Sequence, residues 1–131
     1  MEYTLDQDQL DEIERILQAE FIELGVHCVC MIDMAGNIVS NLDNGEVSFD
    51  VYSLAALAAG NFGAVSAMAN MVGESEFSLL FHKGKEENIH FSRVTEDFLL
   101  ITIFGKETSL GFLRLKVAEA IKKFQTILKT G

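Results

Sequence analysis

The feature that most constrains this chain is a long segment, Val51–Gly73, that contains no charged residue. Its composition predicts a helix. A helix on the surface of a soluble domain needs one apolar face and carries charged residues on the other. Because this segment lacks charge all round, we expect the helix to be covered on at least two sides.

A helical wheel divides this predicted helix into two faces. One is an apolar stripe expected to lie on a sheet, made of Leu54, Leu57, Ala58, Val65, Met68 and Val72. The other, about half a turn away, is a line of very small residues: Ala56, Gly60, Gly63 and Ala67. Two glycines inside a helix cost about 1 kcal/mol each relative to alanine, and close approach of a second helix would offset that cost. The simplest second helix is the same helix of another copy, packed across a two-fold axis.

Two other interpretations of this segment stay open. It is long enough to span a membrane, although Asn61 and Asn70 interrupt it and its flanks are acidic, without a basic anchor. It could also be a core helix buried within a single chain. We favour burial in a homodimer, and we expect no insertion into a membrane.

Length and composition indicate a single domain over residues 1–131. The 131 residues include no proline, and 49% are hydrophobic, which is enough to form a core. A net charge of −10 disfavours binding to nucleic acid. Cys28 and Cys30 are too far apart on a strand for an unstrained disulfide, and the N-terminus does not resemble a signal peptide. We therefore expect a cytoplasmic protein.

The remaining periodicity predicts the order α-β-β-α-β-β-β-α. Thr4 is expected to cap the first helix, whose apolar positions run from Leu10 to Leu24, and Gly25 to end it. Ser109 or Thr108 is expected to open the last helix. The predicted strands are Val26–Asp33, Ile38–Leu42, Phe77–His82, Asn88–Val94 and Phe98–Phe104. These elements form one five-stranded sheet with helices on both faces, an α/β (α+β sandwich) domain.

The sequence shows no arrangement of catalytic, cofactor-binding or metal-binding residues. His27 points to the opposite strand face from Cys28, so the two cannot join Cys30 in a metal site. His82 and His90 fall on neighbouring strands, where they could face each other, but no further ligand accompanies them. No nucleophile elbow or P-loop occurs. We therefore expect a protein that is not an enzyme and binds no cofactor.

Three short motifs, in this order, resemble the Roadblock/dynein light chain family. The first is the Asp-x-x-Gly-x-Ile hairpin formed by Asp33, Gly36 and Ile38. The second is the small-residue run Leu54–Ala59, and the third is Ser109–Leu115, which is similar to the start of the family's last helix. Each motif alone is weak, but their order and spacing cover nearly the whole chain.

The resemblance implies a Roadblock/profilin-like antiparallel sheet of order 2-1-5-4-3. The first and last helices would lie on one face and the uncharged helix on the other. It also implies a homodimer formed by the uncharged helix and the edge of the third strand. The interface residues predicted in this way are Ala56, Gly60, Gly63, Ala67, Phe77, Leu79 and Phe81.

For function, the resemblance implies a regulator of a small Ras-like GTPase. Stand-alone prokaryotic members of the MglB type regulate motility or polarity GTPases by stimulating GTP hydrolysis. No arginine finger carries over to this sequence, so stimulation would come from ordering the switch loops of the partner. A third, uncharged side of the helix is predicted to contact that partner through Tyr52, Ala59, Ser66 and Asn70.

Two alternatives remain beside a GTPase regulator. One is a scaffold or adaptor of the dynein light chain type that joins larger proteins without affecting hydrolysis. The other is a ligand-sensing module, since small sheets flanked by helices often enclose ligands. The sequence offers no cluster of inward polar groups for such a ligand.

Overall fold

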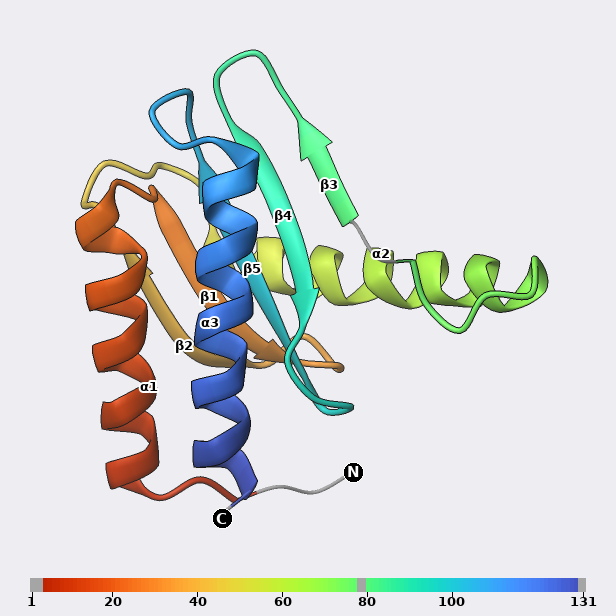
Figure 1. Cartoon of the computed structure of the whole chain (residues 1–131), viewed down its shortest axis with the longest axis horizontal. Helices are drawn as coiled ribbons and strands as arrows, with labels where there is room; N and C mark the ends of the chain where they lie inside the picture. The colour runs from red at the N-terminus through yellow and green to blue at the C-terminus, as the bar shows by residue number, and fades with distance from the viewer. Residues whose placement is uncertain (1–3, 78–79, 130–131) are drawn as a thin grey trace.

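A computed structural model of the chain describes residues 4–77 and 80–129. It contains one five-stranded antiparallel sheet with the order β2-β1-β5-β4-β3 and three α-helices (Figure 1). The predicted order of elements and of strands is therefore confirmed. The elements are α1 Gln7–Glu20, the 3-10 helix η1 Ile22–Leu24, β1 Cys28–Asp33, β2 Ile38–Asp43, α2 Val51–Met71, β3 Leu80–Lys83, β4 Asn88–Arg93, β5 Phe98–Phe104 and α3 Leu110–Lys129.

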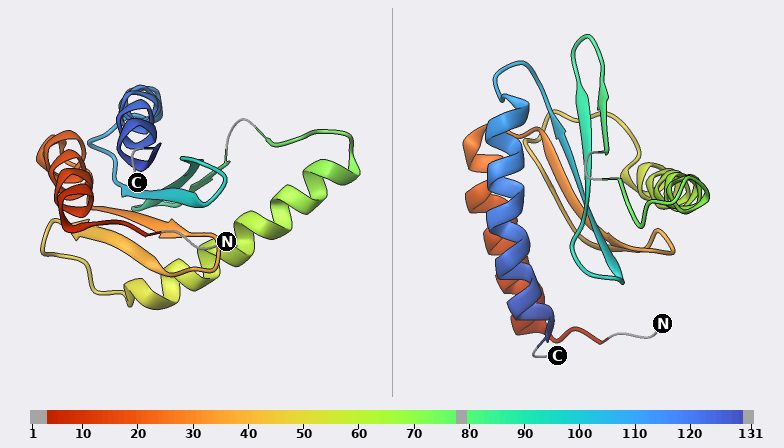
Figure 2. Two further views of the ribbon diagram at one scale, coloured as in Figure 1. Left: turned by 90° about the horizontal axis from the view of Figure 1, so that it is seen from below. Right: turned by 45° about the vertical axis from the view of Figure 1, so that its right-hand side comes forward.

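The sheet separates two hydrophobic clusters. Helices α1 and α3 pack on one face, and α2 lies on the other (Figure 2). Because side chains alternate along a strand, Val29 and Met31 of β1 face α1 and α3, whereas Cys30 and Ile32 face α2. The central strands β1 and β5 are buried along their whole length.

The first helix begins two residues later than predicted. Asp6, not Thr4, is its N-cap: the Asp6 carboxylate accepts a hydrogen bond of 2.8 Å from the backbone N–H of Gln9. The Gln9 side chain in turn accepts a 2.9 Å bond from the backbone N–H of Asp6. This reciprocal capping box satisfies two backbone donors, which a threonine two residues earlier would leave unpaired.

The strand at the sheet edge also differs from the prediction. Strand β3 runs from Leu80 to Lys83 rather than from Phe77 to His82, and residues 78 and 79 lie outside the described part of the chain. His82 pairs with Ile89, and His90 pairs with Phe81. The two histidines therefore point to opposite faces of the sheet, and the expectation that they could face each other is wrong.

The hairpin between β1 and β2 explains the Asp-x-x-Gly motif. The buried Asp33 carboxylate accepts hydrogen bonds from the backbone N–H groups of Ala35 at 3.0 Å and Asn37 at 2.8 Å. Gly36 has a φ of +91°, and a Cβ at this position would lie 3.0 Å from the Cα of Ala56 in α2. The hairpin therefore supports α2 directly.

Replacement of Gly36 with alanine is expected to destabilise the domain by roughly 1–3 kcal/mol, because the substitution adds backbone strain and pushes against α2. Gly45→Ala is the matched control, since Gly45 has a φ of +84° but no atom within 4 Å of an added Cβ. Urea denaturation of both variants separates strain from contact. Equal losses in the two variants would contradict the proposed contact with α2.

Candidate functional site

Helix α2 starts at a well-defined cap. The Asp50 carboxylate accepts a 2.8 Å hydrogen bond from the Ser53 hydroxyl and a 3.0 Å bond from the backbone N–H of Tyr52. These bonds, the one from Ser53 first, lower the pKa of Asp50. The predicted start of the helix at Val51 is therefore confirmed.

The face of α2 that lies on the sheet is not the predicted one. Its buried residues are Ala55, Ala58, Phe62 and Ala69, and of the six residues in the predicted stripe only Ala58 is buried. The helix is rotated by about a quarter turn from the expected phase, given 100° per residue. Three of the four buried residues are alanines, so α2 can lie close to the strands while the larger Phe62 fills the remaining space.

Several of the larger apolar residues of α2 consequently face solvent. We define the outer face of α2 as Ala56, Leu57, Gly60, Gly63, Ala67 and Met68. Leu57 is 74% exposed and Met68 is 53% exposed. A Cβ added to Gly60 or Gly63 would meet no atom within 4 Å. This apolar face is open in the single chain, and large exposed apolar patches mark interaction sites.

The second half of α2 extends past the edge of the sheet (Figure 2). Met71 and Val72 at its end are 85% and 70% exposed. The chain then returns toward β4, where Arg93 forms a 2.7 Å ion pair with Glu76 and lies 5.0 Å from the centre of the Phe62 ring. These contacts fix the return segment to the domain and leave the end of the helix projecting.

Among the described helices, α2 is the one that has the length and apolar composition of a membrane span, and little of it is buried within the chain. Most of the apolar surface of α2 is therefore open in the single chain.

The residues predicted to contact a partner lie along one flank of α2. Tyr52 and Asn70 are exposed, with Tyr52 at 75%. Ala59 and Ser66 are half-buried, and Ala59 packs against the cluster between α2 and the sheet. The four residues are thus spread between solvent and sheet, and their role stays a prediction.

The predicted interface residues near the sheet edge have different environments. Phe77 is exposed, whereas the Phe81 ring is half-buried on the face of α1 and α3 and stacks on Phe104 with centroids 6.0 Å apart. Leu79 lies outside the described residues. Phe81 therefore contributes mainly to the core of its own domain, and a contact with another chain at this edge would involve the backbone of β3.

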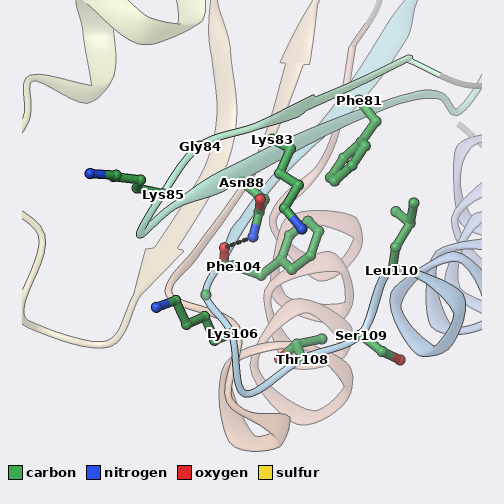
Figure 3. Close-up of a pocket in the computed structure, with 11 residues that line it drawn as sticks. Phe81, Lys83, Gly84, Lys85, Asn88, Phe104, Lys106, Thr108, Ser109 and Leu110 are labelled. Atoms are coloured by element: carbon green, nitrogen blue, oxygen red, sulfur yellow. Dashed lines mark hydrogen bonds between the residues drawn. The ribbon is translucent and has the colours of Figure 1, made fainter.

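A pocket of about 380 Å³ lies between the β3–β4 turn and the start of α3. Lys83 reaches toward Phe104, whereas Lys85 and Lys106 extend away from it (Figure 3). The Asn88 side chain donates a 3.2 Å hydrogen bond to the backbone carbonyl of Phe104. The pocket lining includes no carboxylate, histidine or cysteine that could act as a base or nucleophile.

The cysteines and histidines do not form a reactive centre within residues 4–77 and 80–129. In that part of the chain no group of three or more potential ligands could hold a metal ion. Burial raises the pKa of Cys28 to about 11 and that of Cys30 to about 12, so both thiols stay protonated and unreactive.

Comparison with known proteins shows which domain family and which solved structures this fold resembles. The model of the Roadblock/LC7 domain matches residues 48–104, which span α2 and strands β3 to β5. The structure is similar to Myxococcus xanthus MglB, with a TM-score of 0.83 and 27% identity over 99% of this chain and 95% of that one. Residues 48–104 of this chain are therefore similar to a Roadblock/LC7 domain.

Two further proteins are similar to this chain over most of its length. Gliding protein MglB from Thermus thermophilus shares the fold of this chain with a TM-score of 0.80, at 22% identity over 100% of this chain and 96% of that one. An uncharacterized protein of Aquifex aeolicus (strain VF5) is 26% identical over 130 residues, which cover 97% of this chain and 79% of that protein. The similarity thus extends beyond the matched region to nearly the full length of the chain.

Proposed function

We propose that this Roadblock domain works as a homodimer that regulates a small Ras-like GTPase in the cytoplasm. The observation that carries the proposal is the outer face of α2, which is apolar, free of charge and open in the single chain. Similarity over the full length to MglB supports the role of a stand-alone regulator.

The dimer would form by packing two copies of α2 against each other. Gly60 and Gly63 leave space for a second helix, while Leu57 and Met68 supply apolar area beside it. Pairing between the backbones of two β3 strands would also protect an edge strand that is otherwise open. Ala56, Gly60, Gly63 and Ala67 remain the proposed centre of this interface.

The regulator would have no catalytic groups of its own. It would act by holding the switch loops of the GTPase in the conformation that hydrolyses GTP. A docking surface next to the paired helices, including the exposed Tyr52 and Asn70, is the proposed contact for the partner. The same dimer without an effect on hydrolysis would be a scaffold, and the rate of GTP hydrolysis by the partner separates a scaffold from a regulator.

Complex formation tests the proposal. The protein is mixed with the Ras-like GTPase encoded in the same genome, loaded with GDP or with a non-hydrolysable GTP analogue, and analysed by size-exclusion chromatography with light scattering. We expect the free protein to elute with twice the mass of the 14.5 kDa chain. We also expect it to form a complex with the GTP-analogue form. A monomer, or no complex in either nucleotide state, would rule the proposal out.

A Tyr52→Ala or Asn70→Ala substitution checks the docking flank. Either change is expected to weaken the complex by roughly tenfold, the effect of losing one central interface contact of about 1.4 kcal/mol. The dimer should stay intact, because neither residue belongs to the outer face of α2. If both variants bind the GTPase with unchanged affinity, the docking surface lies elsewhere.

A further inference from the structure

The β3–β4 turn and the β5–α3 loop lie at the same end of the sheet (Figure 1). At this end His27 lies between two carboxylates. Nδ1 of His27 is 2.9 and 2.8 Å from the two carboxylate oxygens of Glu87. Nε2 of His27 is 2.8 Å from Oε1 of Glu107. Glu87 belongs to the turn between β3 and β4, and Glu107 to the loop before α3. The imidazole ring thus links two loops that are distant in the sequence.

The backbone of His27 is held in place by hydrogen bonds to two neighbouring segments. Its backbone N–H donates a 2.9 Å hydrogen bond to the carbonyl of Ile103, and its carbonyl accepts a 2.9 Å bond from the N–H of Asn44. The side chains of Glu87 and Glu107 are 54% and 57% exposed. The two loops are therefore held toward a residue that is anchored on both sides to neighbouring segments.

The ring fits because residue 105 has no side chain. A Cβ at Gly105 would lie 2.7 Å from Cε1 of His27 and would also collide with the Glu107 carboxylate. Such distances do not occur for real Cβ atoms, so any other residue would displace the ring or the Glu107 carboxylate. The glycine thus makes the arrangement of the three side chains possible.

The arrangement requires a proton. A neutral imidazole has one N–H and can donate to one carboxylate, whereas an imidazolium donates to both. Burial of the ring opposes its charge, but the hydrogen bond and charge of Glu87, followed by those of Glu107, outweigh burial and raise the pKa of His27. Among the other charged residues close by, Glu46 of the β2–α2 loop lines the same hollow as the ring, and Lys106 follows Gly105.

We propose that His27 is a proton-controlled latch, which as an imidazolium fastens the β3–β4 turn and the β5–α3 loop to the start of β1 and which releases the β3–β4 turn on losing its proton. Glu87 also lines an apolar groove of about 400 Å³ beside α2, together with Phe49, Leu54 and Leu57. Release of Glu87 would therefore alter the rim of a groove next to the outer face of α2. The latch goes beyond the proposed function and holds with or without a GTPase partner.

The first test is an NMR titration of the His27 ring in the full chain, in which the Hε1 and Cε1 shifts report protonation. We compare the natural sequence with Glu87→Gln, Glu107→Gln and the control Glu86→Gln, all of which change exposed side chains. The titration midpoint is expected to fall in the first two variants and to stay in place in the control. Equal midpoints in all four proteins would overturn the latch.

The second test measures whether the turn is released. The backbone N–H of Gly84 donates a 3.0 Å hydrogen bond to the carbonyl of Glu87, so its exchange with solvent reports opening of the turn. Its protection factor is expected to fall by about threefold or more above the His27 midpoint, the effect of losing a partly exposed ion pair. In Glu87→Gln the protection factor should not change across that pH range. A pH-independent value in the natural sequence would also overturn the proposal.

Discussion

A leucine in place of Gly60 or Gly63 is expected to abolish the homodimer while leaving the single domain folded. In the chain itself a Cβ added to either glycine would meet no atom within 4 Å, so the new side chain points into open space. Replacing a glycine inside a helix also favours the helical state by about 1 kcal/mol. The folded monomer should therefore be at least as stable as before.

In the proposed dimer the same leucine would separate two closely packed helices. Overpacking a tight contact costs about 1–3 kcal/mol, and a two-fold axis places the substitution in the interface twice. The dissociation constant is thus expected to rise by roughly 30-fold or more. Analytical ultracentrifugation measures this constant directly.

Gly111→Leu is the matched control for this experiment. Gly111 lies in α3, and a Cβ there also meets nothing within 4 Å. It is remote from the outer face of α2, so the control should remain a dimer. Dissociation of both kinds of variant, or of neither, would contradict an interface centred on the outer face of α2.

The second large effect is a loss of stability in acid that depends on His90. This residue is 4% exposed, and burial, with a smaller effect of Arg114, lowers its pKa to about 4. In the unfolded chain a histidine takes up its proton near pH 6.5. Between these two values the unfolded state binds more protons than the folded state, so stability falls as the pH falls.

The expected loss between pH 6.5 and pH 4 is roughly 3 kcal/mol, from 1.36 kcal/mol per pKa unit. Urea denaturation across this range measures it, and His90→Leu should flatten the profile. His82→Leu on the neighbouring strand is the control, because His82 is exposed. An unchanged acid profile in His90→Leu would show that another group is responsible.

His27 acts in a different pH range and can be told apart. Its raised pKa means that its contribution to stability is complete below the unfolded pKa and is lost as the pH rises through the folded pKa. The loss of stability caused by His90 occurs below the pKa of histidine in the unfolded chain, and the loss caused by His27 occurs above it. His90 therefore lowers the stability of the domain as the pH falls, and His27 lowers it as the pH rises.

Sequence reasoning succeeded where the signal is local. The bounds of β5 match the prediction, because an apolar run from Phe98 to Phe104, interrupted at Thr102, is confined by short turns. The start of α2 at Val51 matches the start of the uncharged segment, and the order of strands follows from the family resemblance.

The sequence pattern did not predict correctly which side of α2 faces the sheet. Larger apolar residues were expected to face the sheet, but Leu57 and Met68 face outward and alanines face the strands. Side-chain size does not indicate which side is buried when both sides of a helix are apolar. Phe62, the bulky aromatic in the middle of the helix, was the signal that could have set the phase.

A sequence pattern also could not predict which carboxylates contact His27. Glu87 is 60 residues away along the chain, and it meets the ring only because β4 and β1 both pair with β5. Periodicity predicts strands but does not predict which loop side chains come together at the end of a sheet.

The most direct test of a regulator is the single-turnover rate of GTP hydrolysis by the Ras-like GTPase encoded in the same genome, measured with and without this protein. A stoichiometric amount of dimer is expected to raise the rate by about tenfold or more, through ordered switch loops, and Gly60→Leu should remove the effect. An unchanged rate in mixtures where the two proteins still form a complex would contradict the regulator and leave the protein as a scaffold.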